Sequence, residues 1–339
     1  MSAPVTAENL VKVYAGKVRA VDGVSFTVNE GELFGFLGPN GAGKTTTVQM
    51  LTGNLRLTSG HAQVAGVDVS ADPLTVKERI GLVFQESTAD PDLTGRENLQ
   101  LAAALFRVPL SSTKATINSL LERMQIGDAA DRLVKTYSGG MRRRLELGVG
   151  IIHSPQVLFL DEPTLGLDPQ GRAGFWHYVQ ELRKDHGMTV FVTTHYLDEA
   201  DTMCDRIAII DHGKIVATGT PSELKDRLGG DVVTVRPTSK TGPEVETLLG
   251  NLPTVVAVSP FEGTYRVKAP RGEELIPVLV EACAKAGIGL AGVSLKRPSL
   301  DEVFLEFTGR EYREDEGLTA TDRAVRIGQV QQAFGRARR

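Results

Sequence analysis

The sequence has little of what characterises several large classes of protein. Its two cysteines, Cys204 and Cys283, lie far apart among 339 residues and in no metal-ligand spacing, which argues against a disulfide-stapled scaffold and favours a reduced, cytosolic location. The six histidines form no i, i+4 pair, so a zinc site on a helix is not expected. No apolar run reaches the ~18 residues that a bilayer-spanning helix needs.

An excess of positive charge is also missing. The chain has 38 lysines and arginines against 42 aspartates and glutamates, which argues against a dominant nucleic-acid-binding surface but not against a local basic patch. We expect no signal peptide, because no charged and then apolar segment begins the sequence. The remaining composition, with 41% hydrophobic and 24% charged residues, is that of a soluble globular protein, and the length predicts two domains.

The most informative stretch is GPNGAGKT at residues 38–45, which has the spacing G-x-x-x-x-G-K-[ST] of a phosphate-binding P-loop. An apolar run at 33–37 precedes it and a helical pattern follows at 45–51, so the loop leads into the positive end of a helix dipole. Its glycines leave the backbone free to turn N–H groups toward phosphate oxygens, while Lys44 can reach the β- and γ-phosphates and Thr45 can bind Mg²⁺. A chance glycine-rich turn would not need these flanking elements.

Short strands surround this loop in the sequence. Residues 5–30 alternate polar and apolar side chains and predict antiparallel strands, and 60–69 predict another hairpin. Tyr14 lies just ahead of the first hairpin, where its ring could stack on a nucleotide base or be an ordinary strand tyrosine, and the residues alone favour neither. The apolar run that begins at Ile80 predicts a strand that ends at Gln85.

A mostly helical insertion is predicted between about 91 and 133, where apolar residues recur near every 3.6 positions. Ser138, Gly139 and Gly140 follow at the start of a further helix, where they form either an anion-receptive helix N-terminus or a plain helix cap. The three arginines at 142–144 could indicate nucleic acid, but charges that pair locally within a helical turn are the more ordinary interpretation.

Two carboxylates end a second buried strand. Residues 157–160 are apolar and predict a parallel strand, after which Asp161 and Glu162 lie where open α/β sheets bind ligands. We expect Asp161 to orient Mg²⁺ and Glu162 to polarise the attacking water, although a strand that simply ends in a polar turn has the same pattern. His195 follows the strand predicted at 189–194. A lone histidine is usually structural, but this position at the same sheet edge favours contact with phosphate.

The pattern changes at Gly229 and Gly230. Between 232 and 295 the predicted order is β-α-β-β-α-β, which suggests a small ferredoxin-like unit, and a last helix is capped at Ser299. This part carries no catalytic constellation, so we interpret it as a regulatory or interaction module. Residues 310–339 mix charges and have few apolar side chains, so we expect a mobile tail there.

Together these motifs resemble the ATP-binding subunit of an ABC transporter over roughly residues 5–310. The matching segments are Walker A at 38–45, the Q-loop at Gln85, the signature at 137–141, Walker B at 157–162, the D-loop around Asp168, the switch at His195 and the A-loop at Tyr14. The stretches THYLDEAD (194–201) and RPSLDEVF (297–304) resemble daunorubicin-resistance-type exporter ATPases more selectively. The signature departs from the common Leu-Ser-Gly-Gly-Gln in having Tyr137 and Met141, so its last position lacks a side-chain amide.

The resemblance implies an α/β fold, namely a P-loop NTPase cassette of the ABC type in which a mixed sheet is joined by an antiparallel β subdomain and a helical insertion. It divides the chain into a cassette at 1–229, with its helical subdomain at about 88–150, and a small α+β ferredoxin-like C-terminal domain at 230–309, with the tail at 310–339. Truncation near Gly229 should then spare ATP binding if the cassette folds alone.

The family also implies a head-to-tail dimer that holds ATP and Mg²⁺ between the P-loop of one copy and the signature of the other. Nucleotide contacts then fall to Tyr14, Gly38, Asn40, Gly41, Gly43, Lys44, Thr45 and Thr46, and in the second copy to Ser138, Gly139 and Gly140. Catalysis falls to Lys44, Gln85, Glu162 and His195, and Mg²⁺ binding to Thr45, Gln85 and Asp161. Glu162→Gln should trap an ATP-bound dimer with little turnover.

An exporter ATPase of this kind works with a separate membrane permease at the cytoplasmic face of the membrane, and no nucleic acid is expected as a partner. The alternative is a soluble ABC ATPase acting on nucleic acid or ribosomes, but such proteins often carry two cassettes or a long coiled-coil insertion, and neither is found in this sequence. A non-catalytic regulatory cassette is a third interpretation, against which Lys44, Asp161, Glu162 and His195 together argue. The permease should choose the transported compound.

Overall fold

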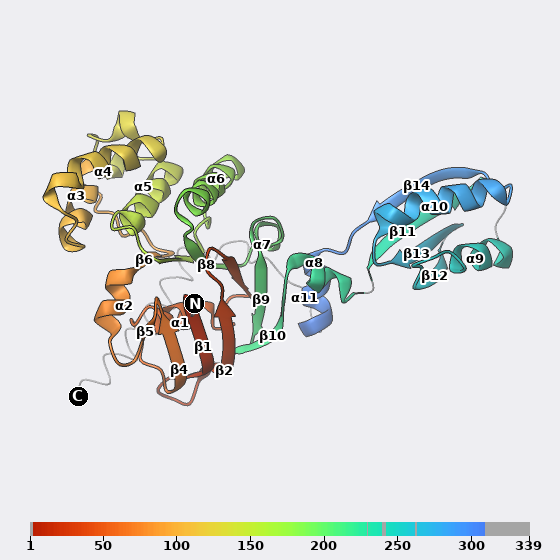
Figure 1. The fold of residues 1–339 in the computed structure, drawn as a ribbon, viewed down its shortest axis with the longest axis horizontal. Coiled ribbons are helices and arrows are strands. Elements are labelled where there is room, and N and C mark those ends of the chain that lie inside the picture. The colour runs from red at the N-terminus through yellow and green to blue at the C-terminus, as the bar shows by residue number, and fades with distance from the viewer. Residues whose placement is uncertain (1–2, 229, 239–241, 262, 309–339) are drawn as a thin grey trace.

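The computed structural model describes residues 3–228, 230–238, 242–261 and 263–308 (Figure 1). The tail predicted at 310–339 lies outside these described residues. Two sheets organise the N-terminal cassette, and a third belongs to a smaller C-terminal domain that lies to one side of it. The mixed sheet, the antiparallel subdomain, the helical insertion and the ferredoxin-like unit predicted from the sequence are all present.

The first sheet is antiparallel and has the strand order β2-β1-β4-β5. It is built from β1 (Val5–Val13), β2 (Arg19–Val28), β4 (Ser59–Val64) and β5 (Val67–Asp68). Along β2, the side chains of Val24, Phe26 and Val28 are buried and those between them are exposed. This alternation is typical of a strand with one face on the core.

The central sheet has the order β10-β9-β3-β8-β7-β6. Its strands are β3 (Leu33–Leu37), β6 (Ile80–Val83), β7 (Val157–Asp161), β8 (Thr189–Thr194), β9 (Arg206–Asp211) and β10 (Lys214–Gly219). All neighbouring strands are parallel except β9 and β10, so β3, β6, β7 and β8 end at one edge. The P-loop, Gln85, the Asp161–Glu162 pair and His195 each follow one of these four ends.

Both faces of the central sheet are covered, which explains why β3, β7 and β8 are buried along their whole length. Between the two sheets, Phe26 of β2 joins a cluster with four phenylalanines of the central sheet, in which the contacting ring centroids lie 5.4–5.8 Å apart. The four are Phe34, Phe36, Phe159 and Phe191. This aromatic core joins the antiparallel subdomain to the strands that carry the site.

Helices complete the cassette. Residues of α1 (Lys44–Leu51) and α2 (Pro73–Arg79) contribute to the core between the sheets, and α6 (Pro169–His186) and α7 (Leu197–Met203) contribute to the core on the other face. The insertion consists of α3 (Gly95–Leu105), α4 (Leu110–Arg123), two short 3₁₀ turns (Gly127–Ala129 and Val134–Thr136) and α5 (Gly139–Ile151). Thr94 starts α3 with a capping box to Glu97.

The C-terminal domain follows α8 (Pro221–Asp226). Its elements are β11 (Asp231–Pro237), α9 (Pro243–Gly250), β12 (Ala257–Phe261), β13 (Thr264–Ala269), α10 (Gly272–Lys285) and β14 (Leu290–Lys296). The sheet order β12-β13-β11-β14, with every pair antiparallel, is that of the ferredoxin-like unit. β11 and β14, the first and last strands of this domain along the chain, are neighbours in the sheet, and Val232 pairs with Lys296.

The last helix, α11 (Leu300–Thr308), returns to the cassette, although the sequence grouped it with residues 230–309. Its buried side chains Leu300, Val303 and Phe304 belong to the cassette core, where α11 packs against α7, α8 and β10. The helical spacing of these three residues predicts an apolar face but not the surface that it covers. Among the described helices, none has the length and apolar content needed to cross a membrane.

Candidate functional site

The P-loop connects β3 to α1 and depends on glycine at two positions. A side chain at Gly38 would collide with the backbone oxygen of Ile210, and one at Gly43 would meet that of Ala20. Gly43 also has a φ of 111°, a backbone conformation that other residues rarely adopt. The glycines therefore let the loop curl tightly against β2 and β9, with the helix N-terminus behind it.

Lys44 is buried beneath this loop. Its Nζ donates hydrogen bonds to the backbone oxygens of Gly38, at 2.7 Å, and Pro39, at 3.3 Å. It also lies 3.1 Å from Oε1 of Glu162, and both side chains are buried. The loop, α1 and the end of β7 are thus joined by one ammonium group.

Glu162 is the centre of the contacts at the sheet edge. Its carboxylate lies between Lys44 and His195, whose Nδ1 is 3.2 Å from Oε2. Burial raises the pKa of Glu162, but the hydrogen bond from His195 and the charge of Lys44 outweigh it and lower this pKa to about 2. The carboxylate is therefore ionised throughout the neutral range.

The backbone of Glu162 is unusual as well. Its φ of 47° lies in the left-handed region, which costs free energy for a residue other than glycine. Its N–H donates to the backbone oxygen of Thr193, at 3.1 Å, and to the hydroxyl of Thr193, at 3.0 Å. Strain of this kind persists only where the surrounding structure holds it.

Asp161 precedes it and faces α1. Its Oδ1 accepts a 2.5 Å hydrogen bond from the hydroxyl of Thr193 and a 3.4 Å one from that of Thr45. Burial, opposed mainly by the Thr193 hydroxyl, raises the pKa of Asp161. The hydroxyl of Thr45 and the carboxylate of Asp161 present hard oxygen atoms side by side, which are the ligands that Mg²⁺ prefers, so these residues fit that ion. Gln85 is exposed just past β6, at the same sheet edge.

Tyr14 lies just beyond β1 and contacts the start of α1. Its hydroxyl is 3.4 Å from that of Thr46, the residue after Thr45, and the side chain is 36% exposed. The ammonium group of Lys12 lies 5.4 Å from the centre of its ring. This partly exposed position beside the P-loop helix differs from that of a strand tyrosine packed in a core. Asn40 is exposed at the tip of the loop.

The signature residues lie apart from this cluster. Ser138 caps α5 and accepts a hydrogen bond from the N–H of Met141, at 3.2 Å. Ser138, Gly139 and Gly140 line a cavity of about 570 Å³ together with Asp168 of the D-loop, and none of the described residues that line it belongs to the P-loop. The side chain of Met141 is half-buried and packs against the cassette core. A ligand bound at the P-loop and one bound in this cavity would occupy different places on one chain.

Two buried charged residues near the site were not predicted. Arg143 belongs to the run at 142–144, where local pairing was expected. It does pair with Glu146, but it also donates to backbone oxygens beside Glu162 and Gln85. Glu199 of α7 accepts a 2.8 Å hydrogen bond from the hydroxyl of Thr164, just after Glu162, and burial raises the pKa of Glu199. Apart from Glu146, the partners of both residues come from other segments, so no sequence pattern marks their place in the site.

Comparison with known proteins agrees with this geometry. Residues 21–165 match the family described as ABC transporter, and residues 219–308 match the C-terminal domain described as ATP-binding protein DrrA1-3-like. The daunorubicin resistance ATP-binding protein DrrA3 of Streptomyces coeruleorubidus is 43% identical over 317 residues, which cover 91% of this chain and 97% of that protein. The Nod factor export ATP-binding protein I of Ralstonia nicotianae is 39% identical, over 91% of this chain and 95% of its own.

Solved structures give the same result for the cassette. CbiO1 of Clostridium perfringens, part of the ABC transporter complex cbiONQ, superposes with a TM-score of 0.62 and 27% identity, over 66% of this chain and 91% of its own. The ADP conformation of MJ1267, an ATP-binding cassette of an ABC transporter, superposes with a TM-score of 0.58 over 65% of this chain and 92% of its own. The chain therefore belongs to the family of ABC transporter ATP-binding proteins, in the DrrA-like group that carries this C-terminal domain.

Proposed function

We propose that this ABC-type ATPase powers the export of a drug, antibiotic or lipid-like compound through a separate membrane permease, at the cytoplasmic face of the membrane. Its relatives support export, since they are named for resistance to daunorubicin and linearmycin and for Nod factor export. The observation that carries the proposal is the contact network of Lys44, Glu162 and His195 beside Asp161. These groups suit phosphoryl transfer to water, in which catalysis is mostly positioning and charge stabilisation.

We assign the roles within this network as follows. Lys44 and the amides of the P-loop bind the β- and γ-phosphates of ATP, and Tyr14 stacks on the base. Thr45 and Asp161, with Gln85, hold Mg²⁺, which when bound neutralises phosphate charge. Glu162 accepts a proton from the attacking water as the water oxygen bonds to the γ-phosphorus and the bond from that phosphorus to the leaving ADP oxygen breaks, and His195 keeps the Glu162 carboxylate aligned.

The contacts of Lys44 suggest an order of events. Nζ of Lys44 lies 3.1 Å from Oε1 of Glu162, and Nδ1 of His195 lies 3.2 Å from Oε2. The phosphates of ATP carry more negative charge than one carboxylate, so they attract the ammonium group of Lys44 away from Oε1 of Glu162. Nucleotide binding would then release one carboxylate oxygen to act on water.

A second copy of the chain would complete the site. Ser138, Gly139 and Gly140 present a helix N-terminus, which suits a phosphate, yet they line a cavity that shares no described residue with the P-loop. A head-to-tail dimer brings the cavity of one copy to the nucleotide of the other. Dimer closure on ATP and reopening after hydrolysis would then drive the permease.

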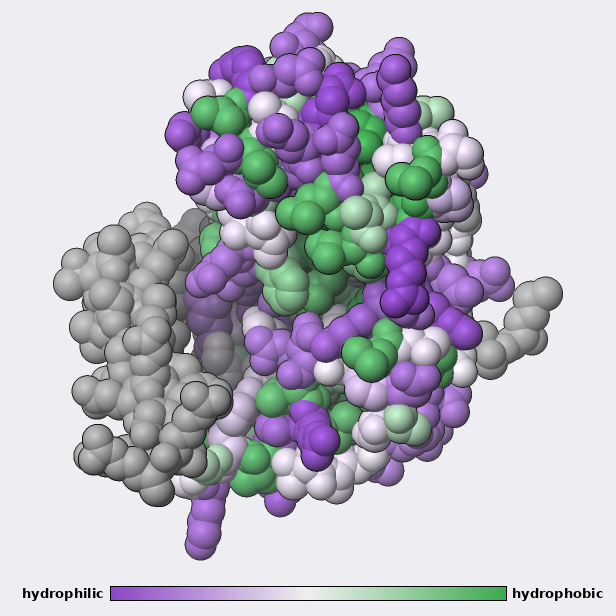
Figure 2. All heavy atoms as spheres, turned by 90° about the vertical axis from the view of Figure 1, so that its left-hand side faces the viewer, coloured by the Kyte–Doolittle hydropathy of each residue, from purple (hydrophilic) through white to green (hydrophobic). Residues whose placement is uncertain are grey.

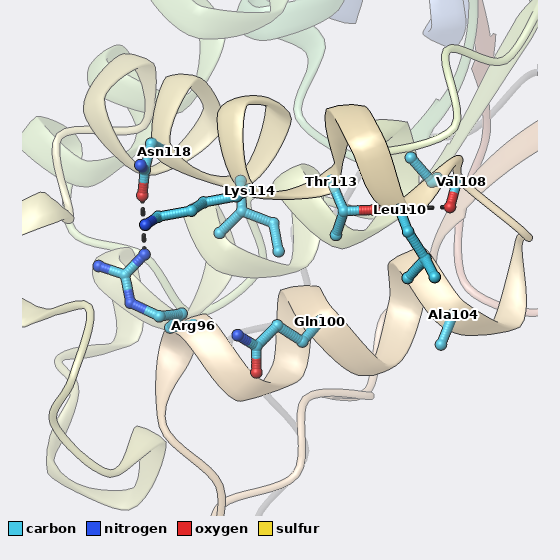
Figure 3. Close-up of a pocket in the computed structure, with 9 residues that line it drawn as sticks. Arg96, Gln100, Ala104, Val108, Leu110, Thr113, Lys114 and Asn118 are labelled. Carbon is cyan, nitrogen blue, oxygen red and sulfur yellow. Dashed lines mark hydrogen bonds between the residues drawn. The ribbon is translucent and has the colours of Figure 1, made fainter.

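The helical insertion offers a surface for that permease. Leu101, Leu105 and Leu110 of α3 and α4 are exposed, Leu105 by 72% and Leu110 by 93%. On the face that carries α3, hydrophobic side chains gather between two more hydrophilic regions (Figure 2). A cavity of about 620 Å³ lies between α3 and α4, with Leu110, Val108 and Ala104 on one side and Arg96, Asn118 and Lys114 on the other (Figure 3). An apolar patch of this kind is typical of a protein–protein contact.

We retain the division of the chain into a cassette at 1–229 and a C-terminal domain at 230–309 as a proposal, with one amendment. The burial of Leu300, Val303 and Phe304 in the cassette core supports counting α11 with the cassette. The module between α8 and α11 would then serve dimer assembly or permease docking rather than chemistry.

The test is Glu162→Gln, which keeps the shape of the side chain and removes its basicity. We expect the variant to bind ATP, to form a dimer that is stable in ATP, and to lose turnover by about 100-fold or more, as for other general bases. Size-exclusion chromatography with ATP and a phosphate-release assay measure both. If the variant hydrolysed ATP at the parent rate, Glu162 would not be the general base. If the variant stayed monomeric in ATP, the proposal that two copies share the nucleotide site would be contradicted.

A further inference from the structure

Arg143 is a buried cation in the first turns of α5, and it bonds to three different segments. Only 7% of its surface is exposed. Its Nη1 lies 2.9 Å from Oε2 of Glu146, three residues further along the same helix, so its charge is neutralised within α5. Its remaining hydrogen bonds all reach backbone oxygens outside that helix.

Those backbone oxygens flank two residues of the site. Nη1 donates to the oxygen of Phe84, at 2.5 Å, and Phe84 immediately precedes Gln85. Nε donates to the oxygen of Pro163, at 2.5 Å, and Nη2 to that of Glu162 itself, at 3.3 Å. A single guanidinium therefore fixes the peptide before Gln85 and two consecutive peptides at Glu162.

The backbone of Glu162 needs such support. With a φ of 47° it is strained, and Thr193 holds only its N–H side. Arg143 and the N–H of Leu165 both donate to its carbonyl oxygen, each at 3.3 Å, so the left-handed conformation is fixed from both directions. The direction of the Glu162 side chain follows from this backbone conformation, and with it the contacts of its carboxylate with Lys44 and His195.

We propose that Arg143 is a positioning residue, through which the orientation of the Glu162 carboxylate depends on the position of α5 and of the segment before Gln85. This inference rests on the proposed role of Glu162. In the proposed dimer, the signature residues Ser138, Gly139 and Gly140 of a chain contact the nucleotide of one site, while Glu162 of the same chain is the base of the other site. Because α5 begins at these signature residues, a phosphate that binds them would fix the position of α5 and, through Arg143, would also align Glu162. Hydrolysis in the two sites would then be coupled through each chain.

Arg143→Lys tests this inference, because lysine keeps the charge but cannot supply the planar fork that reaches all three oxygens. We expect kcat to fall about 10- to 100-fold, as for a misplaced catalytic group, while the affinity for ATP stays within about threefold of the parent. Arg123→Lys is the matched control. Arg123 also joins the insertion to the core, through an exposed ion pair with Asp185, and its replacement should leave kcat unchanged.

A double-mutant cycle separates positioning from general support of the fold. If Arg143 acts through Glu162, Arg143→Lys should change the single-turnover rate by less than about twofold once Glu162 is Gln. Thermal unfolding checks that each variant is folded. If Arg143→Lys does not fold, Glu146→Gln takes its place, because it removes the anion that orients the guanidinium. Glu146→Gln should also lower kcat, and again only when Glu162 is present.

The outcomes are distinct. A folded Arg143→Lys variant with parent kcat, or an equal loss of rate with Glu162 and with Gln at that position, would overturn the inference about Arg143. If Glu146→Gln is used instead, a folded variant with parent kcat, or with an equal loss of rate in both backgrounds, would overturn the inference as well. A parent-like rate in Glu162→Gln alone would instead overturn the proposed role of Glu162, whatever Arg143 does.

Discussion

Glu162 has a carboxylate whose charge is stabilised by Lys44 and His195, and this makes part of the folding free energy depend on pH. Its pKa, about 2 in the folded chain against 4.5 ordinarily, is depressed. The stability that it contributes is therefore fully present above pH 4.5 and is lost as the pH falls toward 2. Since each pH unit between two such pKa values corresponds to ~1.4 kcal/mol, the ion contacts contribute up to about 3 kcal/mol.

We therefore expect the difference in free energy of unfolding between the parent and Glu162→Gln to shrink as the pH falls below 4.5. Urea denaturation without nucleotide, from pH 7 down to the lowest pH at which the parent stays folded, measures this difference. A difference that does not change with pH would mean that the Glu162 carboxylate is not stabilised by its contacts with Lys44 and His195.

Among the elements, α5 and α3 offer a matched pair of helix starts. Ser138 caps α5 and Thr94 caps α3, each through a side-chain oxygen that accepts a backbone hydrogen bond. Replacing either by alanine should cost about 1 kcal/mol of stability. Only Ser138→Ala should also reduce ATP turnover, by about tenfold, because only Ser138 is proposed to meet the phosphates of a second copy. Thermal unfolding and phosphate release compare the two variants, and an equal loss of turnover would contradict the signature role of Ser138.

The sequence predicts most elements because their signals are local. The apolar run of β7 and the P-loop between β3 and α1 need no distant partner to be recognised. Within the C-terminal domain, the sequence predicts a strand at 255–258, whereas the structure has β12 at Ala257–Phe261. This edge strand is mostly exposed, so no alternation of buried residues marks its ends, and they are set by pairing with β13.

The positions of most candidate site residues are predictable for the same reason, because their sequence signals are also local. Lys44, Asp161, Glu162 and His195 each follow a recognisable strand, and the parallel topology brings those strand ends together. Arg143 could not be assigned in this way, because its partners outside α5 are backbone oxygens and every residue has one. Its burial depends on how α5 packs against neighbouring elements, among them β6, α3 and α6.

On the scale of the whole molecule, α11 changes what a truncation should do. Ending the chain near Gly229, which the sequence alone predicts to be harmless for ATP binding if the cassette folds alone, also removes Leu300, Val303 and Phe304 from the cassette core. Losing three buried side chains of this size costs several kcal/mol, on the order of 2 or more each. We expect the truncated chain to unfold at a much lower temperature and to bind ATP weakly.

Excision of the domain is the control for that truncation. Because Val232 and Lys296 are paired neighbours, a short glycine-serine linker can join residue 230 to residue 297 and keep α11 in place. The excised chain should bind ATP as the parent does, as measured by nucleotide titration and thermal unfolding. If the truncated and excised chains were equally stable, α11 would not belong to the cassette core.

The paired strands β11 and β14 also mean that the C-terminal domain is attached to the cassette by two chain segments that leave it side by side. A module on one flexible tether swivels freely, but two adjacent tethers resist twisting. A rotation imposed on this domain by a binding partner would therefore be transmitted to α8 and α11. Since α11 packs against α7, it would then reach α7, which begins two residues after His195. The C-terminal domain is thus mechanically connected, through α11, to the helix that follows His195.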